Sequence, residues 1–84
     1  MSIIIVRIRI ESKCEVIMKI FCERLKELRE EKKLTSPQLA KILHVNHSTI
    51  LRWESGEISP NIEHLYNIAE FFGVSADYLI GLEN

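Results

Sequence analysis

The stretch from Thr35 to Gly56, TSPQLAKILHVNHSTILRWESG, decides the fold of this chain. It predicts two short helices joined by a tight turn. The first helix begins after Thr35, whose hydroxyl suits the backbone amide of Gln38 in a capping box. Pro37 falls in the first turn, where its missing N–H does no harm. This helix is expected to end near His44.

The second helix follows Asn46, a favoured N-cap residue, and ends at Gly56, which suits the left-handed position after a helix. Helical spacing puts Ile50 and Trp53 on one apolar face, and Val45 just before the helix also packs inward. The opposite face gathers side chains that are mostly able to form hydrogen bonds: His47, Ser48, Leu51, Arg52 and Ser55.

Two short helices with an apolar inner face and a polar outer face are typical of a helix-turn-helix (about residues 36–55), which inserts its second helix into the major groove of DNA. Arg52 suits a bidentate contact with the O6 and N7 atoms of guanine. His47 and Ser48, at the helix start, reach base edges or phosphates, and Leu51 suits a thymine methyl group. Thr49 fits either phosphate contact or packing.

The first residues follow a different pattern. From Ser2 to Glu11, β-branched residues alternate with Arg7, Arg9 and Glu11, and this period of two predicts a strand. A lone strand needs a partner edge, so the prediction includes pairing with the same strand of a second copy. The alternative is an upstream extension, with Met18 as a natural start. Residues 1–17 are therefore treated as an extension and 18–84 as the helical domain.

The rest of the chain predicts three further helices. Between about Glu15 and Lys33, apolar residues recur at spacings of three and four, which indicates an amphipathic helix. Asn61 and Ser75 are N-caps for two helices near the C-terminal end. Leu39, Ile42 and Leu43 of the first central helix are expected to face the core. The apolar residues at helical spacing in the other three helices are Ile17, Phe21, Leu25, Leu28, Ile62, Leu65, Ile68, Ala69, Phe72, Tyr78, Leu79 and Leu82.

Composition narrows the class of protein. The 84 residues are 46% hydrophobic and 27% charged, which fits one globular domain. No apolar run approaches the roughly 20 residues of a membrane span, so we expect a cytoplasmic protein with no membrane association. The net charge is −1, and from Ile20 onward seven basic residues face ten acidic ones. That balance is unusual for a protein that binds DNA.

Cysteines and histidines give no sign of a metal site. Cys14 and Cys22 do not form a C-x-x-C pair, and their spacing to the three histidines matches no zinc pattern. Free thiols are expected, with no metal. The chain also lacks a phosphate-binding glycine loop, a nucleophile elbow and a credible pair of carboxylates, so neither a cofactor nor enzymatic activity is expected.

The central stretch resembles the phage-repressor family of Xre/Cro-type helix-turn-helix regulators, and the resemblance extends from about Ile20 to Leu82. It is carried by the W-E-x-G signature at 53–56, by the closing GVSADYLIGL, and by the inward positions Leu39, Ala40, Leu43, Val45, Ile50 and Trp53. The resemblance implies an all-α, five-helix, lambda-repressor-like DNA-binding domain.

The resemblance also implies roles for individual residues. The family often pairs an arginine late in its first helix with the glutamate of the W-E-x-G stretch, and Arg29 and Glu54 stand at these positions. The alternative is two solvated charges. Ser36 stands where the family often contacts phosphate with a glutamine. Two residues depart from the pattern, since His44 replaces a turn glycine and Glu57 replaces a basic residue that contacts phosphate.

Two functions are consistent with the sequence. The first is a sequence-specific regulator of transcription that binds double-stranded DNA, a repressor acting as a homodimer on a palindromic operator. The dimer contact would come from the N-terminal strand, from the last helix, or from both. The second is a protein-interaction module, an antitoxin or anti-repressor with a toxin or another regulator as its partner. The low positive charge and Glu57 motivate this alternative.

Overall fold

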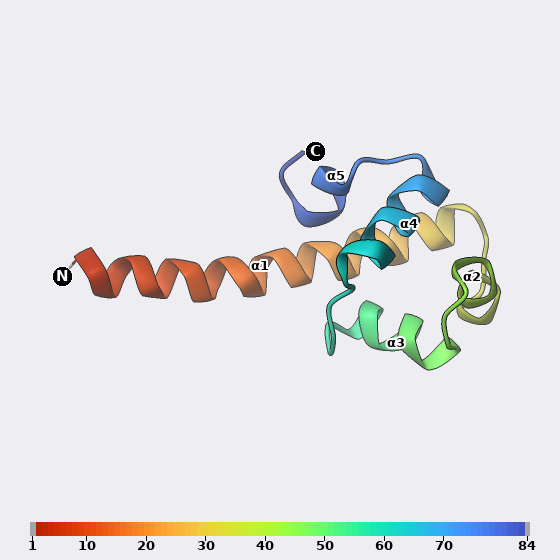
Figure 1. Cartoon of the computed structure of the whole chain (residues 1–84), viewed down its shortest axis with the longest axis horizontal. Coiled ribbons are helices and arrows are strands. Elements are labelled where there is room, and N and C mark those ends of the chain that lie inside the picture. Colours follow the sequence, from red (N-terminus) through yellow and green to blue (C-terminus); the bar gives the residue numbers. More distant parts are fainter. Residues whose placement is uncertain (1, 84) are drawn as a thin grey trace.

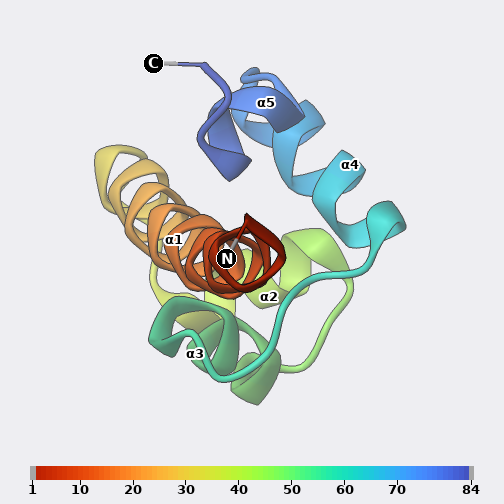
Figure 2. The same cartoon turned by 90° about the vertical axis from the view of Figure 1, so that its left-hand side faces the viewer.

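The computed structural model describes the backbone of residues 2–83 and the side chains of residues 15–83. The described residues form five helices: α1 (Ser2–Glu31), α2 (Ser36–Leu43), α3 (His47–Ser55), α4 (Ile62–Phe72) and α5 (Ala76–Ile80). The four short helices gather around the C-terminal half of α1, while its N-terminal half extends beyond them (Figures 1 and 2). Helix α1 packs against α3 and α5, and α2 packs against α3 and α4. The prediction of a five-helix, all-α fold is confirmed.

The strand predicted for residues 2–11 is wrong, because this segment is the first part of α1. A helix forms its backbone hydrogen bonds within its own segment, whereas a strand needs a neighbouring edge. No strand exists among residues 2–83 to supply that edge, and no glycine or proline interrupts Ser2–Glu31. The division between an extension at 1–17 and a domain at 18–84 stays a prediction, and α1 crosses that boundary without a break.

The ends of the two central helices follow the predicted chemistry except at Asn46. The capping box is present, because the Gln38 amide donates to Thr35 Oγ1 at 3.3 Å and the Thr35 amide donates to Gln38 Oε1 at 2.8 Å. His44 ends α2 in the left-handed conformation, with φ at 59°. Asn46 precedes α3 without a side-chain cap bond, and Gly56 ends it with φ at 80°. The turn between α2 and α3 is therefore tight.

The last two helices also begin at the predicted N-cap residues. Asn61 accepts a hydrogen bond from the His64 amide at the start of α4, and Ser75 accepts one from the Tyr78 amide at the start of α5. Both predicted N-caps are confirmed.

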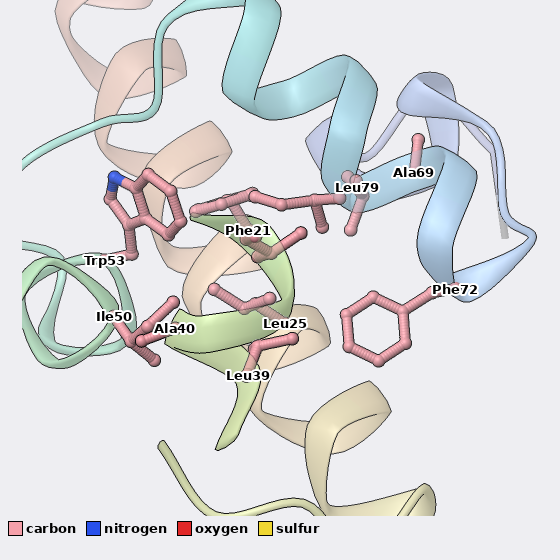
Figure 3. Close-up of a cluster of buried hydrophobic side chains, with 11 residues drawn as sticks. Phe21, Leu25, Leu39, Ala40, Ile50, Trp53, Ala69, Phe72 and Leu79 are labelled. Carbon is pink, nitrogen blue, oxygen red and sulfur yellow. The ribbon is translucent and has the colours of Figure 1, made fainter. Parts of the chain in front are cut away.

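The core lies where α1 meets the other four helices (Figure 3). Phe21 and Leu25 of α1 are at most 1% exposed and lie between residues of α2 and α3 on one side and residues of α4 and α5 on the other. The buried set comprises Phe21, Leu25, Leu39, Ala40, Leu43, Ile50, Trp53, Ile68, Ala69, Phe72 and Leu79.

One residue predicted to face the core, Ile42, does not, and two apolar residues of the patterns near the C-terminal end, Ile62 and Leu82, are also exposed. Ile42 is 39% exposed, Leu82 73% and Ile62 88%. Ile62 is the first residue of α4 and Leu82 follows the end of α5. Helical spacing thus grouped these three residues with the buried ones, although their side chains are exposed.

Arg24 of α1 links this helix to the C-terminal end of the chain through hydrogen bonds and a cation–π contact. Its guanidinium donates to the backbone oxygens of Tyr78 and Glu83, and it lies 4.3 Å from the centre of the Tyr78 ring. Such a cation–π contact adds to the apolar packing of Leu79 against α1. Over the part of the chain that the structure describes, no helix is both long and apolar enough to cross a membrane.

Candidate nucleic-acid interface

Helix α3 is held by its inner face. Ile50 is fully buried and Trp53 is 1% exposed. The centre of the Trp53 ring lies 5.2 Å from the centre of the His64 ring of α4. Val45, in the turn, packs against the same core, and Ala40 is small enough for α2 and α3 to approach closely. These contacts fix the rotation of α3 about its axis, so its outer face is determined by the fold.

The outer face of α3 carries the five residues that the sequence predicted there. Leu51 is 49% exposed and the other four, His47, Ser48, Arg52 and Ser55, are exposed too. Thr49 is half-buried, which leaves both of its predicted roles open. The structure thus brings the candidate residues onto one open surface. Their contact with DNA stays a prediction.

Arg29 and Glu54 join α1 to the end of α3. Arg29 Nε lies 2.6 Å from Glu54 Oε2, and Nη2 donates to Oε1 at 3.0 Å. The side chains are 13% and 9% exposed. The hydrogen bond to Glu54 raises the pKa of Arg29 above its ordinary value, so the guanidinium stays charged. The resemblance implied this pair, and the solvated alternative does not fit these distances.

Arg29 also braces the turn after α1. Its Nη1 donates to the Leu34 carbonyl at 2.8 Å. The loop between α1 and α2 is therefore tied to the same guanidinium that holds α3. One side chain thus fixes the start of the helix-turn-helix relative to its end.

Arg52, the side chain assigned to guanine, is paired with Glu57 on the outer surface. The closest approach is 3.5 Å, between Arg52 Nε and Glu57 Oε2, and the side chains are 58% and 64% exposed. The turn at Gly56 creates this proximity, since the Glu57 amide donates to the Arg52 carbonyl at 3.0 Å. The sequence singled out both residues but did not indicate that they meet.

Ser55 and Ser36 differ in the hydrogen-bond donors that are available to a phosphate. Ser55 Oγ donates to the Arg52 carbonyl at 3.1 Å, so its proton is engaged within α3. At the start of α2 the capping box engages the amide of Gln38, and Pro37 has no N–H. This leaves the amide and hydroxyl of Ser36 as donors, at a helix end whose dipole favours an anion.

Among the described side chains, residues 15–83, no three histidine, cysteine, aspartate or glutamate residues lie close enough together to hold a metal ion. Cys22 has a free thiol beside the end of α3, and burial raises its pKa above the ordinary value. A structural residue that the sequence analysis missed is Arg24. Its position on α1 carried no signal, because its acceptors are backbone oxygens more than fifty residues away.

Residues 25–79 match the model of a helix-turn-helix family. The chain belongs to this family of Xre/Cro-type helix-turn-helix regulators. It is 46% identical over 63 residues to the HTH-type transcriptional activator BcrR of Enterococcus faecalis, an alignment that covers 75% of this chain and 31% of that protein. It is 31% identical over 61 residues to the cryptic phage CTXphi transcriptional repressor RstR of Vibrio cholerae, over 73% of this chain and 55% of that one.

The alignments with two other similar proteins cover a larger share of those proteins than the alignment with BcrR does. An uncharacterized HTH-type transcriptional regulator of Methanocaldococcus jannaschii is 39% identical over 54 residues, covering 64% of this chain and 82% of that protein. The crystal structure of a transcriptional regulator from Listeria innocua superposes with a TM-score of 0.69 at 39% identity, over 73% of this chain and 57% of that one. The chain spans 31% to 56% of the length of the first three curated relatives that it matches.

Proposed function

We propose that this chain is a regulator of transcription that binds a specific sequence in double-stranded DNA, with α3 as its recognition helix. The observation that carries the proposal is the outer face of α3, which is open and rich in hydrogen-bonding groups above the buried Ile50 and Trp53. The transcriptional activator and the transcriptional repressor among the relatives both support a role in the regulation of transcription.

Within this function, Arg52 reads a guanine and the first turn of α3 reads neighbouring bases or phosphates through His47 and Ser48. Leu51 meets a thymine methyl group, and Ser36 with the start of α2 contacts the backbone. We assign repression as the outcome, because occupying promoter DNA requires no contact beyond this surface.

The binding form is a homodimer on a palindromic operator. One module of this size gains few contacts with DNA, and two copies would place their recognition helices about 34 Å apart, one turn of the duplex. With the strand excluded, the α4–α5 surface supports this pairing. It has a hollow of about 470 Å³ with a mostly apolar lining that includes Ile62, Leu65 and Tyr66. Sedimentation of the wild type and of a Tyr66→Lys variant tests it, and an unchanged monomer in both would refute the homodimer.

The experiment that tests DNA binding is selection of bound duplexes from a random pool, followed by titration of the selected duplex at several salt concentrations. Arg52→Ala is expected to abolish discrimination at one base pair in each half-site, a loss of about 5- to 150-fold for a bidentate contact. Selection of no common sequence, or unchanged discrimination in the variant, would refute the assignment.

A protein-interaction role is the second candidate, as an antitoxin or anti-repressor. The specific observation in its favour is the ion pair of Arg52 with Glu57, which puts a carboxylate where the partner DNA would carry phosphates. No specific complex with DNA at low salt would favour this role over the first.

A further inference from the structure

We propose that Glu57 is a specificity-determining residue of the DNA interface, which positions Arg52 for a base and weakens binding to the phosphate backbone. The proposal rests on the proposed function, DNA binding by α3. It adds a role for a residue that the family resemblance treats only as the loss of a phosphate contact.

The geometry gives Glu57 a fixed place beside Arg52. Gly56 turns the chain back with φ at 80°, and the amides of Glu57 and Ile58 then approach the Arg52 carbonyl at 3.0 and 3.5 Å. The Glu57 backbone is thus anchored to the residue whose side chain its carboxylate faces. Neither side chain is buried, so the pair forms without a large cost of desolvation.

The atom that Glu57 approaches decides what Arg52 can still do. The carboxylate lies closest to Nε, at 3.5 Å, on the inner side of the guanidinium. The Nη1 and Nη2 groups at the far end remain able to donate, and a pair of parallel N–H groups matches the O6 and N7 acceptors of guanine. A guanidinium whose Nε faces a carboxylate at this distance samples fewer orientations before it meets the base, so less entropy is lost on binding.

The same carboxylate acts against binding that ignores sequence. A free arginine at the end of a recognition helix finds phosphates on any duplex. Here the negative charge of Glu57 neutralises Arg52 toward a distant phosphate and repels a near one. A base that accepts two hydrogen bonds in a fixed direction is affected less, because the contact is made by the Nη groups. The net effect is lower affinity for all DNA and higher discrimination among sequences.

The test compares the wild-type chain with Glu57→Gln on three kinds of duplex: the selected sequence, the same sequence changed at the Arg52-dependent base pair, and an unrelated duplex of equal length. Glu57→Gln is expected to bind the unrelated duplex more tightly, with a steeper dependence on salt. Discrimination at the Arg52-dependent base pair is expected to fall about two- to fivefold, the effect of one exposed ion pair.

Two controls separate positioning from charge. Glu27→Gln removes one negative charge from the exposed face of α1 and should leave discrimination at that base pair unchanged. In an Arg52→Ala background, Glu57→Gln should have no effect on discrimination. If Glu57→Gln strengthens binding to all three duplexes by the same factor, or changes none, the inference is overturned while DNA binding stands. If the wild type selects no sequence, the proposed function is overturned and this inference with it.

Discussion

Removing Arg29 is expected to destabilise the fold more than removing any exposed charge on α1. Its guanidinium makes two contacts with Glu54 and one with the Leu34 carbonyl, and its side chain is only 13% exposed. Breaking a buried ion pair from one side costs about 3–5 kcal/mol, because the remaining charge has no partner. Some water reaches this pair, so we expect Arg29→Met to lower the free energy of unfolding by about 2–4 kcal/mol.

The assay is equilibrium unfolding in urea followed by the fluorescence of Trp53. It is the only tryptophan of the chain and is 1% exposed in the fold. In a domain of this size each kcal/mol corresponds to about 4–8 °C in the melting temperature, so the effect is also visible by heating. Lys26→Met, on an exposed position of the same helix, is the matched control and should change stability by less than about 0.5 kcal/mol.

A double-mutant cycle isolates the pair itself. Because the partners share two contacts, Glu54→Leu combined with Arg29→Met should cost less than the two separate losses added together, with a coupling of about 1–3 kcal/mol. Additive losses would refute the reasoning, as would a loss in Arg29→Met no larger than that in Lys26→Met.

Three further predictions concern the backbone and the thiol at the edges of the interface. Gly56→Ala should destabilise the fold by about 1–2 kcal/mol in urea unfolding, since φ is 80° and the new Cβ would lie 3.2 Å from Cys22 Sγ; an unchanged midpoint would contradict this. His44→Gly should change stability by no more than about 1 kcal/mol, because relief of the left-handed strain at φ 59° is offset by greater freedom of the unfolded chain; a larger loss would mean that the side chain itself is needed. Because burial raises the pKa of Cys22, the folded state favours the thiol, and this stabilisation is present at neutral pH and lost as pH rises through the raised pKa. In a Cys14→Ser background, iodoacetamide at about pH 8 should alkylate the folded chain more slowly than the urea-unfolded chain, and equal rates would contradict it.

The helical part of the fold could be predicted from local signals because those signals match the contacts that stabilise it. Each short helix begins at a residue whose side chain or backbone conformation suits an N-cap, and α3 and α4 end at a left-handed glycine. The apolar spacing of α3 also gave the correct inner face, with Ile50 and Trp53 buried.

Where the sequence misled, the deciding information was not local. Alternation of isoleucine and arginine over residues 2–11 predicts a strand only if another edge is present, and the described chain has none. Ile62 continues an apolar stripe, but its side chain is 88% exposed. Periodicity shows which residues share a face, and it does not show whether that face is covered.

The pair of Arg52 and Glu57 shows the same limit at the candidate site, with a consequence for function. Read separately, Arg52 suggests recognition of guanine and Glu57 suggests weakened contact with phosphate. The turn at Gly56 brings them to 3.5 Å, so their effects are coupled and cannot be added as if the two residues were independent. A chain with a net charge of −1 has little general attraction for DNA to lose. Under that condition, a carboxylate that restrains the single arginine of the recognition helix lowers affinity for every duplex while it increases the dependence of binding on sequence.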